Sequence, residues 1–128
     1  NKDLHQKLIS FNNPNLIPLG FVNNINDLIY TSDIVISKPG GLSSTEIATI
    51  RKPLIHAYGI PGIETHNIAF YSSHGLSLNS KKEEDIIQNV TKLLEDQDLC
   101  NEMLIHQKET INRNSAKDLV DLIKEIKL

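Results

Sequence analysis

Two adjacent glycines, Gly40 and Gly41, stand between a short apolar run at residues 34–36 and a segment rich in hydroxyl groups. The apolar run predicts a strand, and the residues after Ser43 predict a helix. The first N–H groups of a helix lack intrahelical acceptors and lie at the positive end of the helix dipole, so they bind anions readily. Glycine, having no Cβ atom, lets the backbone approach a ligand closely. The pattern predicts a phosphate-binding turn at the carboxyl end of a parallel strand.

The same residues also allow a purely local interpretation. Ser43 and Glu46 have the spacing of a capping box, in which each side chain accepts a hydrogen bond from the backbone N–H of the other residue. Two glycines after a strand can simply form a turn. The segment is neither a Walker A loop, since Lys38 precedes the glycines, nor a G-x-G-x-x-G fingerprint. On the local pattern alone, a phosphate site and a capped helix are both open.

The sequence shows little sign of other site chemistry. No serine lies in a G-x-S-x-G elbow, and the five histidines lack the spacing of metal ligands such as H-E-x-x-H, so no metal is expected. The single cysteine, Cys100, fits a reducing compartment and is best interpreted as a small helix residue. The formal net charge of -3 argues against a nucleic-acid binder, which normally carries a basic face.

Alternating strand and helix patterns predict the elements that would position the turn. The predicted strands span residues 16–22, 33–37, 54–58 and 76–78. Three predicted helices begin after Asn24, after Ser43 and after Ser80, where Ser80 and Glu83 repeat the capping-box spacing. Three more span about residues 66–74, 98–113 and 119–126, and Gly75 would end the first of these. This order indicates an α/β domain with a parallel sheet flanked by helices, in which ligands bind beyond the carboxyl ends of the strands. The loops at 20–24, 38–45 and 59–65 would meet there.

Length and composition suit one domain with a real core, because the chain has 128 residues, 39% of them hydrophobic and 23% charged. No apolar stretch approaches the roughly 20 residues of a membrane span. The chain begins with Asn1 rather than Met, as a fragment would. The last helix has an apolar stripe, which we expect to pack on the chain's own sheet. The alternative is that the stripe packs on another domain and is partly exposed here, favouring self-association. The stripe consists of Leu119, Val120, Leu122, Ile123 and Ile126.

Several motifs in one order resemble the C-terminal, donor-binding half of two-domain (GT-B) glycosyltransferases. The resemblance is greatest to monogalactosyldiacylglycerol synthase and the processive diacylglycerol glucosyltransferases, and more distant to the peptidoglycan N-acetylglucosaminyltransferase. It covers the region from Pro18 to Gly75, about half of the chain. The motifs are Gly20-Phe21-Val22, residues 28–33, Ser37-Lys38-Pro39-Gly40-Gly41 with Glu46, and then Pro61-Gly62, Glu64, Asn67 and Gly75.

The resemblance implies a glycosyltransferase that moves a hexose from a UDP-sugar to a lipid acceptor such as diacylglycerol, with no cofactor beyond the donor substrate. Residues 1–128 would be one donor-binding domain, truncated at its N-terminus and inactive alone. The expected general base would lie in a missing N-terminal domain, which would also make any membrane contact. This chain is then expected to be cytoplasmic, and the full-length enzyme peripheral to the membrane.

The resemblance also implies roles for individual residues. Phe21 and Val22 would line the uracil pocket, with a core aromatic as the alternative for Phe21. Glu46 would bind the ribose hydroxyls, since a carboxylate accepts two neighbouring O–H donors. N–H groups and hydroxyls would bind the pyrophosphate, with Lys38 and the helix dipole taking the place of a metal. The residues implied for the pyrophosphate are Gly40, Gly41, Leu42, Ser43 and Ser44, and those implied for the donor sugar are Gly62, Glu64 and Asn67.

Two departures keep other functions open. Ile63 stands where the family usually has glutamine and cannot hydrogen-bond a sugar hydroxyl, so the choice of sugar is open. His66 stands where small or polar residues are usual and is expected to be an exposed residue at a helix start. One alternative is a non-catalytic nucleotide-binding domain, or a subunit that needs a separate acceptor-binding chain. Another is a sugar-nucleotide epimerase, whose additional acidic residues are not recognisable here.

Overall fold

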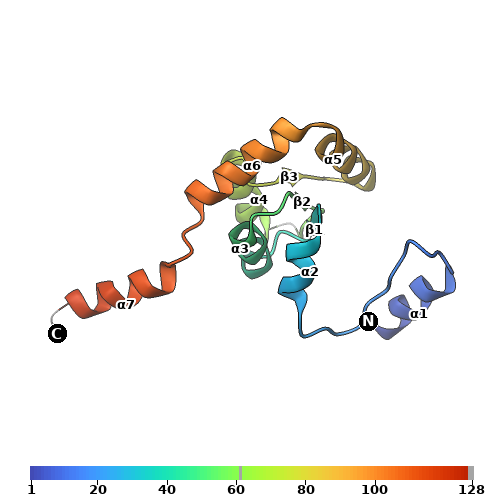
Figure 1. Ribbon diagram of the computed structural model, residues 1–128, viewed down its shortest axis with the longest axis horizontal. Coiled ribbons are helices and arrows are strands. Elements are labelled where there is room, and N and C mark those ends of the chain that lie inside the picture. Colours follow the sequence, from blue (N-terminus) through green and yellow to red (C-terminus); the bar gives the residue numbers. More distant parts are fainter. Residues whose placement is uncertain (61, 127–128) are drawn as a thin grey trace.

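A parallel sheet of three strands forms the centre of the computed structural model, which describes residues 1–60 and 62–126 (Figure 1). The strands β1 (Val35–Ser37), β2 (Leu54–His56) and β3 (Leu78–Asn79) lie in the order β1-β2-β3. Ser37 is opposite His56, and His56 is opposite Asn79, so the three strands end at the same edge of the sheet. The predicted α/β fold with a parallel sheet is confirmed.

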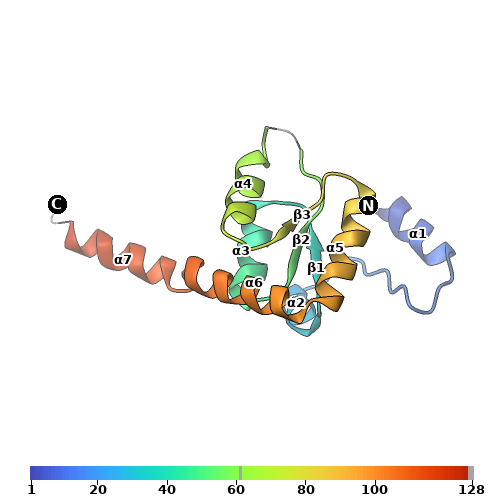
Figure 2. The same cartoon turned by 90° about the horizontal axis from the view of Figure 1, so that it is seen from above.

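Helices cover both faces of this sheet (Figure 2). In chain order the helices are α1 (Lys2–Ser10), α2 (Ile25–Thr31), α3 (Gly41–Ile50), α4 (Thr65–Ser73), α5 (Glu83–Glu95), α6 (Gln97–Thr110) and α7 (Ser115–Glu125), of which α1 and α7 lie away from the sheet (Figure 1). Successive residues of the buried central strand point to opposite faces. Leu54 therefore packs with Ile47 of α3 and Tyr71 of α4, whereas Ile55 packs with Leu93 of α5 and with α6.

The segment 16–22 is irregular, so the strand predicted there is wrong. Pro18 has no N–H to donate to a sheet, and its carbonyl instead accepts a hydrogen bond from His5 of α1 at 3.2 Å. Phe21 is 95% exposed, which also excludes a role as a core aromatic. An apolar run forms a strand only beside a partner strand, and β1 pairs here only with β2 among the described residues.

Neither predicted capping box forms, because both helices begin at other residues. Helix α3 begins at Gly41 with Gly40 as its N-cap, so Ser43 already lies within the first turn. At the start of α5, the Asp85 carboxylate accepts hydrogen bonds from the N–H groups of Lys81 (2.8 Å) and Lys82 (3.2 Å), in place of a Ser80–Glu83 pair. The strand predicted at 76–78 is displaced to Leu78–Asn79.

Helix α7 extends away from the sheet (Figure 1). Its five stripe residues are 49–59% exposed, and none of the residues that the structure describes in α7 is buried. The expectation that the stripe packs on the chain's own sheet is wrong, and the alternative of an exposed apolar face is confirmed. Arg113, in the connection before α7, donates a hydrogen bond to the Thr49 carbonyl in the last turn of α3. Among the described residues, no helix is both long and apolar enough to cross a bilayer.

Gly75 ends α4 as predicted and has φ +65°, a conformation that L side chains rarely adopt. We expect Gly75→Ala to lower the free energy of unfolding by about 1–2 kcal/mol. An added Cβ would also lie 2.5 Å from Nδ1 of His106, whose ring would have to move. Urea denaturation followed by circular dichroism measures the loss. Gly20→Ala is the control, because its Cβ would meet nothing within 4 Å. Equal losses in both variants would contradict the prediction.

Candidate functional site

The turn that follows β1 presents the N-terminus of α3 to solvent. The Gly40 N–H donates to the Lys38 carbonyl at 2.8 Å, which closes the turn, and α3 begins at the next residue. The first intrahelical bond runs from the Ser44 N–H to the Gly40 carbonyl at 3.0 Å. The N–H groups of residues 41–43 precede it and so have no acceptor within the helix. Strand, glycine turn and helix start therefore lie as the sequence predicts for an anion-binding turn.

A buried polar chain fixes this first helical turn to the sheet. Ser44 Oγ lies 2.9 Å from His56 Nε2, and Ser77 Oγ lies 3.1 Å from His56 Nδ1. A neutral imidazole has one donor and one acceptor nitrogen, so one serine donates to the ring and the other accepts from it. The Ser44 side chain is fully buried. The expectation that its hydroxyl meets a pyrophosphate is therefore wrong: Ser44 supports the turn from beneath.

Burial keeps His56 neutral. The ring has no exposed surface, and loss of solvation lowers its pKa from 6.5 to about 4, although the nearby Glu64 charge acts in the opposite direction. A neutral ring can keep one nitrogen as a hydrogen-bond acceptor. The two hydrogen bonds of His56, one with Ser44 and one with Ser77, therefore depend on an uncharged ring.

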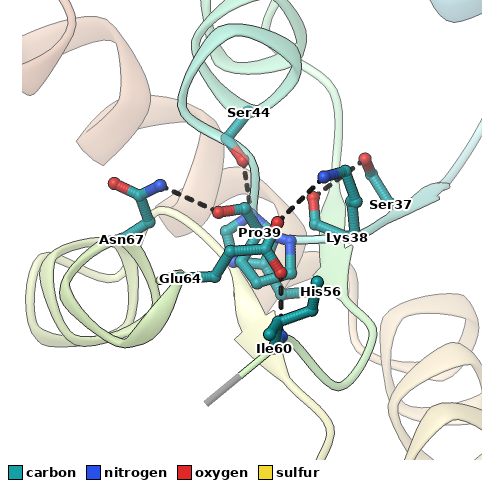
Figure 3. Close-up of polar contacts among 8 residues, drawn as sticks. All are labelled: Ser37, Lys38, Pro39, Ser44, His56, Ile60, Glu64 and Asn67. Atoms are coloured by element: carbon teal, nitrogen blue, oxygen red, sulfur yellow. Dashed lines mark hydrogen bonds and ion pairs between the residues drawn. The ribbon is translucent and has the colours of Figure 1, made fainter. Parts of the chain in front are cut away.

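The loop after β2 brings a carboxylate next to the turn. Glu64 is buried at the start of α4; its Oε2 accepts from the Ile60 N–H at 3.0 Å, and its Oε1 accepts from Lys38 Nζ at 3.0 Å (Figure 3). These two contacts, the Ile60 N–H first, lower the pKa of the Glu64 carboxyl. Gly59 lets the loop pack this tightly, since an added Cβ would lie 2.7 Å from Pro39 Cγ and 3.1 Å from Glu64 Oε2.

Asn67 connects α4 to the same turn. Its Nδ2 donates to the Pro39 carbonyl at 2.9 Å (Figure 3) and lies 3.8 Å from the place that a Cβ of Gly41 would occupy. Of the residues implied for the donor, the structure thus brings together Gly40, Gly41, Glu64 and Asn67. Leu42 and Ser43 are exposed beside them on the first turn of α3.

Among the described residues, no side-chain hydrogen bond joins the remaining predicted residues to this group. Glu46 is exposed on α3 and lines a cavity of about 260 Å³ with Asn26 of α2. Phe21 lines a different cavity, of about 620 Å³, with residues of α1. Gly62 is exposed, with φ +87°, and its N–H donates to Thr65 Oγ1 at 3.0 Å. Val22 ends the irregular segment 16–22, and Pro61 lies outside the described residues.

Three contributors to the site were not singled out from the sequence. His56 and Ser77 form the layer beneath the turn, and Gly59 allows the close packing of the loop. A histidine that ends an otherwise apolar buried strand is a signal for such a layer, because a buried polar group needs partners. In residues 1–60 and 62–126, no three His, Cys, Asp or Glu side chains come together as a metal site would require.

Curated proteins similar to the chain include several processive diacylglycerol beta-glucosyltransferases, whereas no family model matches it. The protein of that name from Bacillus subtilis (strain 168) is 34% identical over 115 residues, which cover 89% of this chain and 30% of the relative. The one from Staphylococcus epidermidis is 30% identical over 115 residues, covering 87% of this chain and 29% of the relative. This chain thus spans about a third of the length of these proteins.

A solved structure shares the fold. The crystal structure of MurG from Acinetobacter baumannii matches with a TM-score of 0.69 at 21% sequence identity. The match covers 84% of this chain and 33% of that one. The share of the longer chain is similar to the share found for the curated relatives, so sequence and structure both match this chain to about a third of a longer protein.

Proposed function

The chain is homologous to processive diacylglycerol beta-glucosyltransferases and has the fold of the C-terminal domain of a GT-B glycosyltransferase, and from this relationship we propose that it binds a UDP-sugar donor. The acceptor of the complete enzyme would be a lipid such as diacylglycerol, the substrate class that the relatives' name gives. Residues 1–128 would form one donor-binding domain, and the remaining two thirds of the enzyme would supply the acceptor site and general base. Any peripheral membrane contact would belong to that other part.

The observation that carries this proposal is the position of Glu64 beside the start of α3. The unpaired N–H groups of residues 41–43 suit a diphosphate, and a carboxylate that ends the neighbouring loop suits sugar hydroxyls. The two groups are joined through Lys38, whose Nζ lies 3.0 Å from Glu64 Oε1. A nucleoside diphosphate sugar has the same two kinds of group next to each other.

The transfer would begin when an acceptor hydroxyl attacks the anomeric carbon of the sugar. As the carbon–oxygen bond to the diphosphate breaks, negative charge grows on the leaving UDP. Fixed N–H groups aimed at that charge lower the barrier, because they need no reorganisation during the reaction. Here these would be the N–H groups of Gly41, Leu42 and Ser43, with Glu46 holding the ribose. The proton of the acceptor would pass to a base outside this chain, so the chain alone is expected to be inactive.

Titration of the chain with UDP, and with ADP as the control, tests the donor site. We expect selective changes in the amide NMR shifts of Val22, Gly40, Gly41 and Glu46 with UDP. Equal changes with both nucleotides would indicate a phosphate turn without base selectivity. A lack of change with either nucleotide would contradict the proposed site in this chain.

A non-catalytic nucleotide-binding domain is the second candidate, and Ile63 favours it. Its apolar side chain is 76% exposed in the loop that would meet the donor sugar. This candidate predicts UDP binding without transfer when the chain is combined with the acceptor-binding part of the Bacillus subtilis relative. Transfer of glucose to diacylglycerol in that combination would exclude it.

A further inference from the structure

The Glu64 carboxylate is largely buried and already hydrogen-bonded within the chain. Its side chain is only 5% exposed, and both oxygens have protein donors, the Ile60 N–H on Oε2 and Lys38 Nζ on Oε1. A carboxylate oxygen can accept two hydrogen bonds, but only 5% of the side chain is exposed and Lys38 already binds Oε1. A sugar hydroxyl that approaches Oε1 therefore competes with Lys38 for little exposed surface.

Lys38 is the exposed partner of this ion pair. Its side chain is 69% exposed, so water can hydrate the ammonium when it leaves Glu64. The Lys38 side chain folds back over the turn. Its Cε lies 3.7 Å, and its Nζ 3.9 Å, from the place that a Cβ of Gly40 would occupy. A flexible ammonium in this place lies within reach of a diphosphate bound at residues 41–43. A diphosphate carries more negative charge than one carboxylate, so it competes with Glu64 for the Lys38 ammonium.

We propose that Lys38 and Glu64 exchange partners when the donor binds. Lys38 moves from Glu64 Oε1 to the diphosphate, and the freed oxygen accepts a hydroxyl of the sugar. Glu64 keeps its bond to the Ile60 N–H, so the loop stays in place. This inference rests on the proposed donor site and adds an order of events to it: the diphosphate prepares the sugar site.

The exchange makes sugar recognition depend on the diphosphate. A free hexose or a ligand without phosphate would meet a carboxylate that is still paired with Lys38. An activated donor supplies the anion that removes Lys38 and then the hydroxyl that replaces it. The site would therefore reject free hexose even though it has a sugar-binding carboxylate.

Two substitutions separate the exchange from a static ion pair. Glu64→Gln retains an oxygen for the Ile60 N–H but presents no charge to Lys38. If the partners exchange, the freed Lys38 raises the affinity for UDP about fivefold. The same variant loses the additional affinity that the sugar gives to UDP-glucose. Lys38→Met lowers the affinity for UDP by a similar factor, and adding Glu64→Gln to it no longer raises that affinity.

Calorimetry with UDP and UDP-glucose on the full chain measures these effects, with Lys82→Met as a matched control. Lys82 is another exposed lysine, 3.9 Å from Glu84, and its loss should change neither affinity. A Glu64→Gln variant that is folded by circular dichroism but binds UDP no more tightly than the wild type would overturn the exchange. Failure of the proposed function appears differently, as a wild-type chain whose Gly41 and Leu42 amide shifts do not respond to UDP.

Discussion

Replacing Gly41 with aspartate is expected to weaken UDP binding about 100-fold while leaving the fold intact. Gly41 is the first residue of α3, and an added Cβ would meet only Asn67 Nδ2, at an ordinary contact distance of 3.8 Å. A carboxylate there would lie beside the bound diphosphate. Two unit charges 4 Å apart repel each other by about 1 kcal/mol in water and about 4 kcal/mol near a protein surface, which brackets the expected loss.

The effect on stability should have the opposite sign. An acidic side chain in the first turn of a helix interacts favourably with the helix dipole, by about 0.3–1 kcal/mol. The Tm of the Gly41→Asp variant should therefore equal or exceed that of the wild type. Gly41→Asn is the matched control, because it has the same shape without the charge. Calorimetric titration of both variants with UDP isolates the electrostatic part of the loss in UDP affinity. Equal weakening by Asp and Asn would mean that shape, not charge, governs this position.

Acid should destabilise the chain through His56, by about 3 kcal/mol between pH 7 and pH 4. The buried ring has a pKa of about 4, against 6.5 in the unfolded chain. Between these values the unfolded state binds more protons than the folded state, so stability is complete above pH 6.5 and is lost as the pH falls towards 4. The physical cause is that a charged imidazole would have to be buried among Ser44 and Ser77.

Urea denaturation at a series of pH values measures this dependence. The window from pH 7 to pH 5 is the most informative, because the lowered pKa of Glu64 affects stability only at lower pH. His56→Gln should be less stable at pH 7 but should show little change in stability across that window. A His56→Gln variant that retains the slope of the wild type would assign the acid sensitivity to another group.

The sequence predicted the central features of the fold because local rules determine them. Two glycines after an apolar run place a turn at the end of β1, and the strand predicted at residues 54–58 forms at Leu54–His56. The parallel order follows from the alternation of strands and helices. These features need no knowledge of distant contacts.

The incorrect predictions have a different cause. They concern features that depend on partners distant in the sequence, or on the exact residue at which a helix begins. Successive residues of a helix point about 100° apart, so beginning α3 at Gly41 turns Ser44 inward and leaves Ser43 outside. The segment 16–22 has the composition of a strand, but no strand lies beside it in the part of the chain that the structure describes. The ion pair of Lys38 and Glu64 joins residues 26 positions apart, which no local pattern indicates.

The contact between Arg113 and the Thr49 carbonyl has a mechanical consequence. Helix α3 has 10 residues and so spans about 15 Å, with the candidate site at one end and Arg113 at the other. Force applied to α7 reaches α3 through this contact as well as through α6, which packs on α3. A single hydrogen bond contributes only about 1 kcal/mol. It would transmit small displacements of α7 to the site and would break before a larger displacement distorted α3.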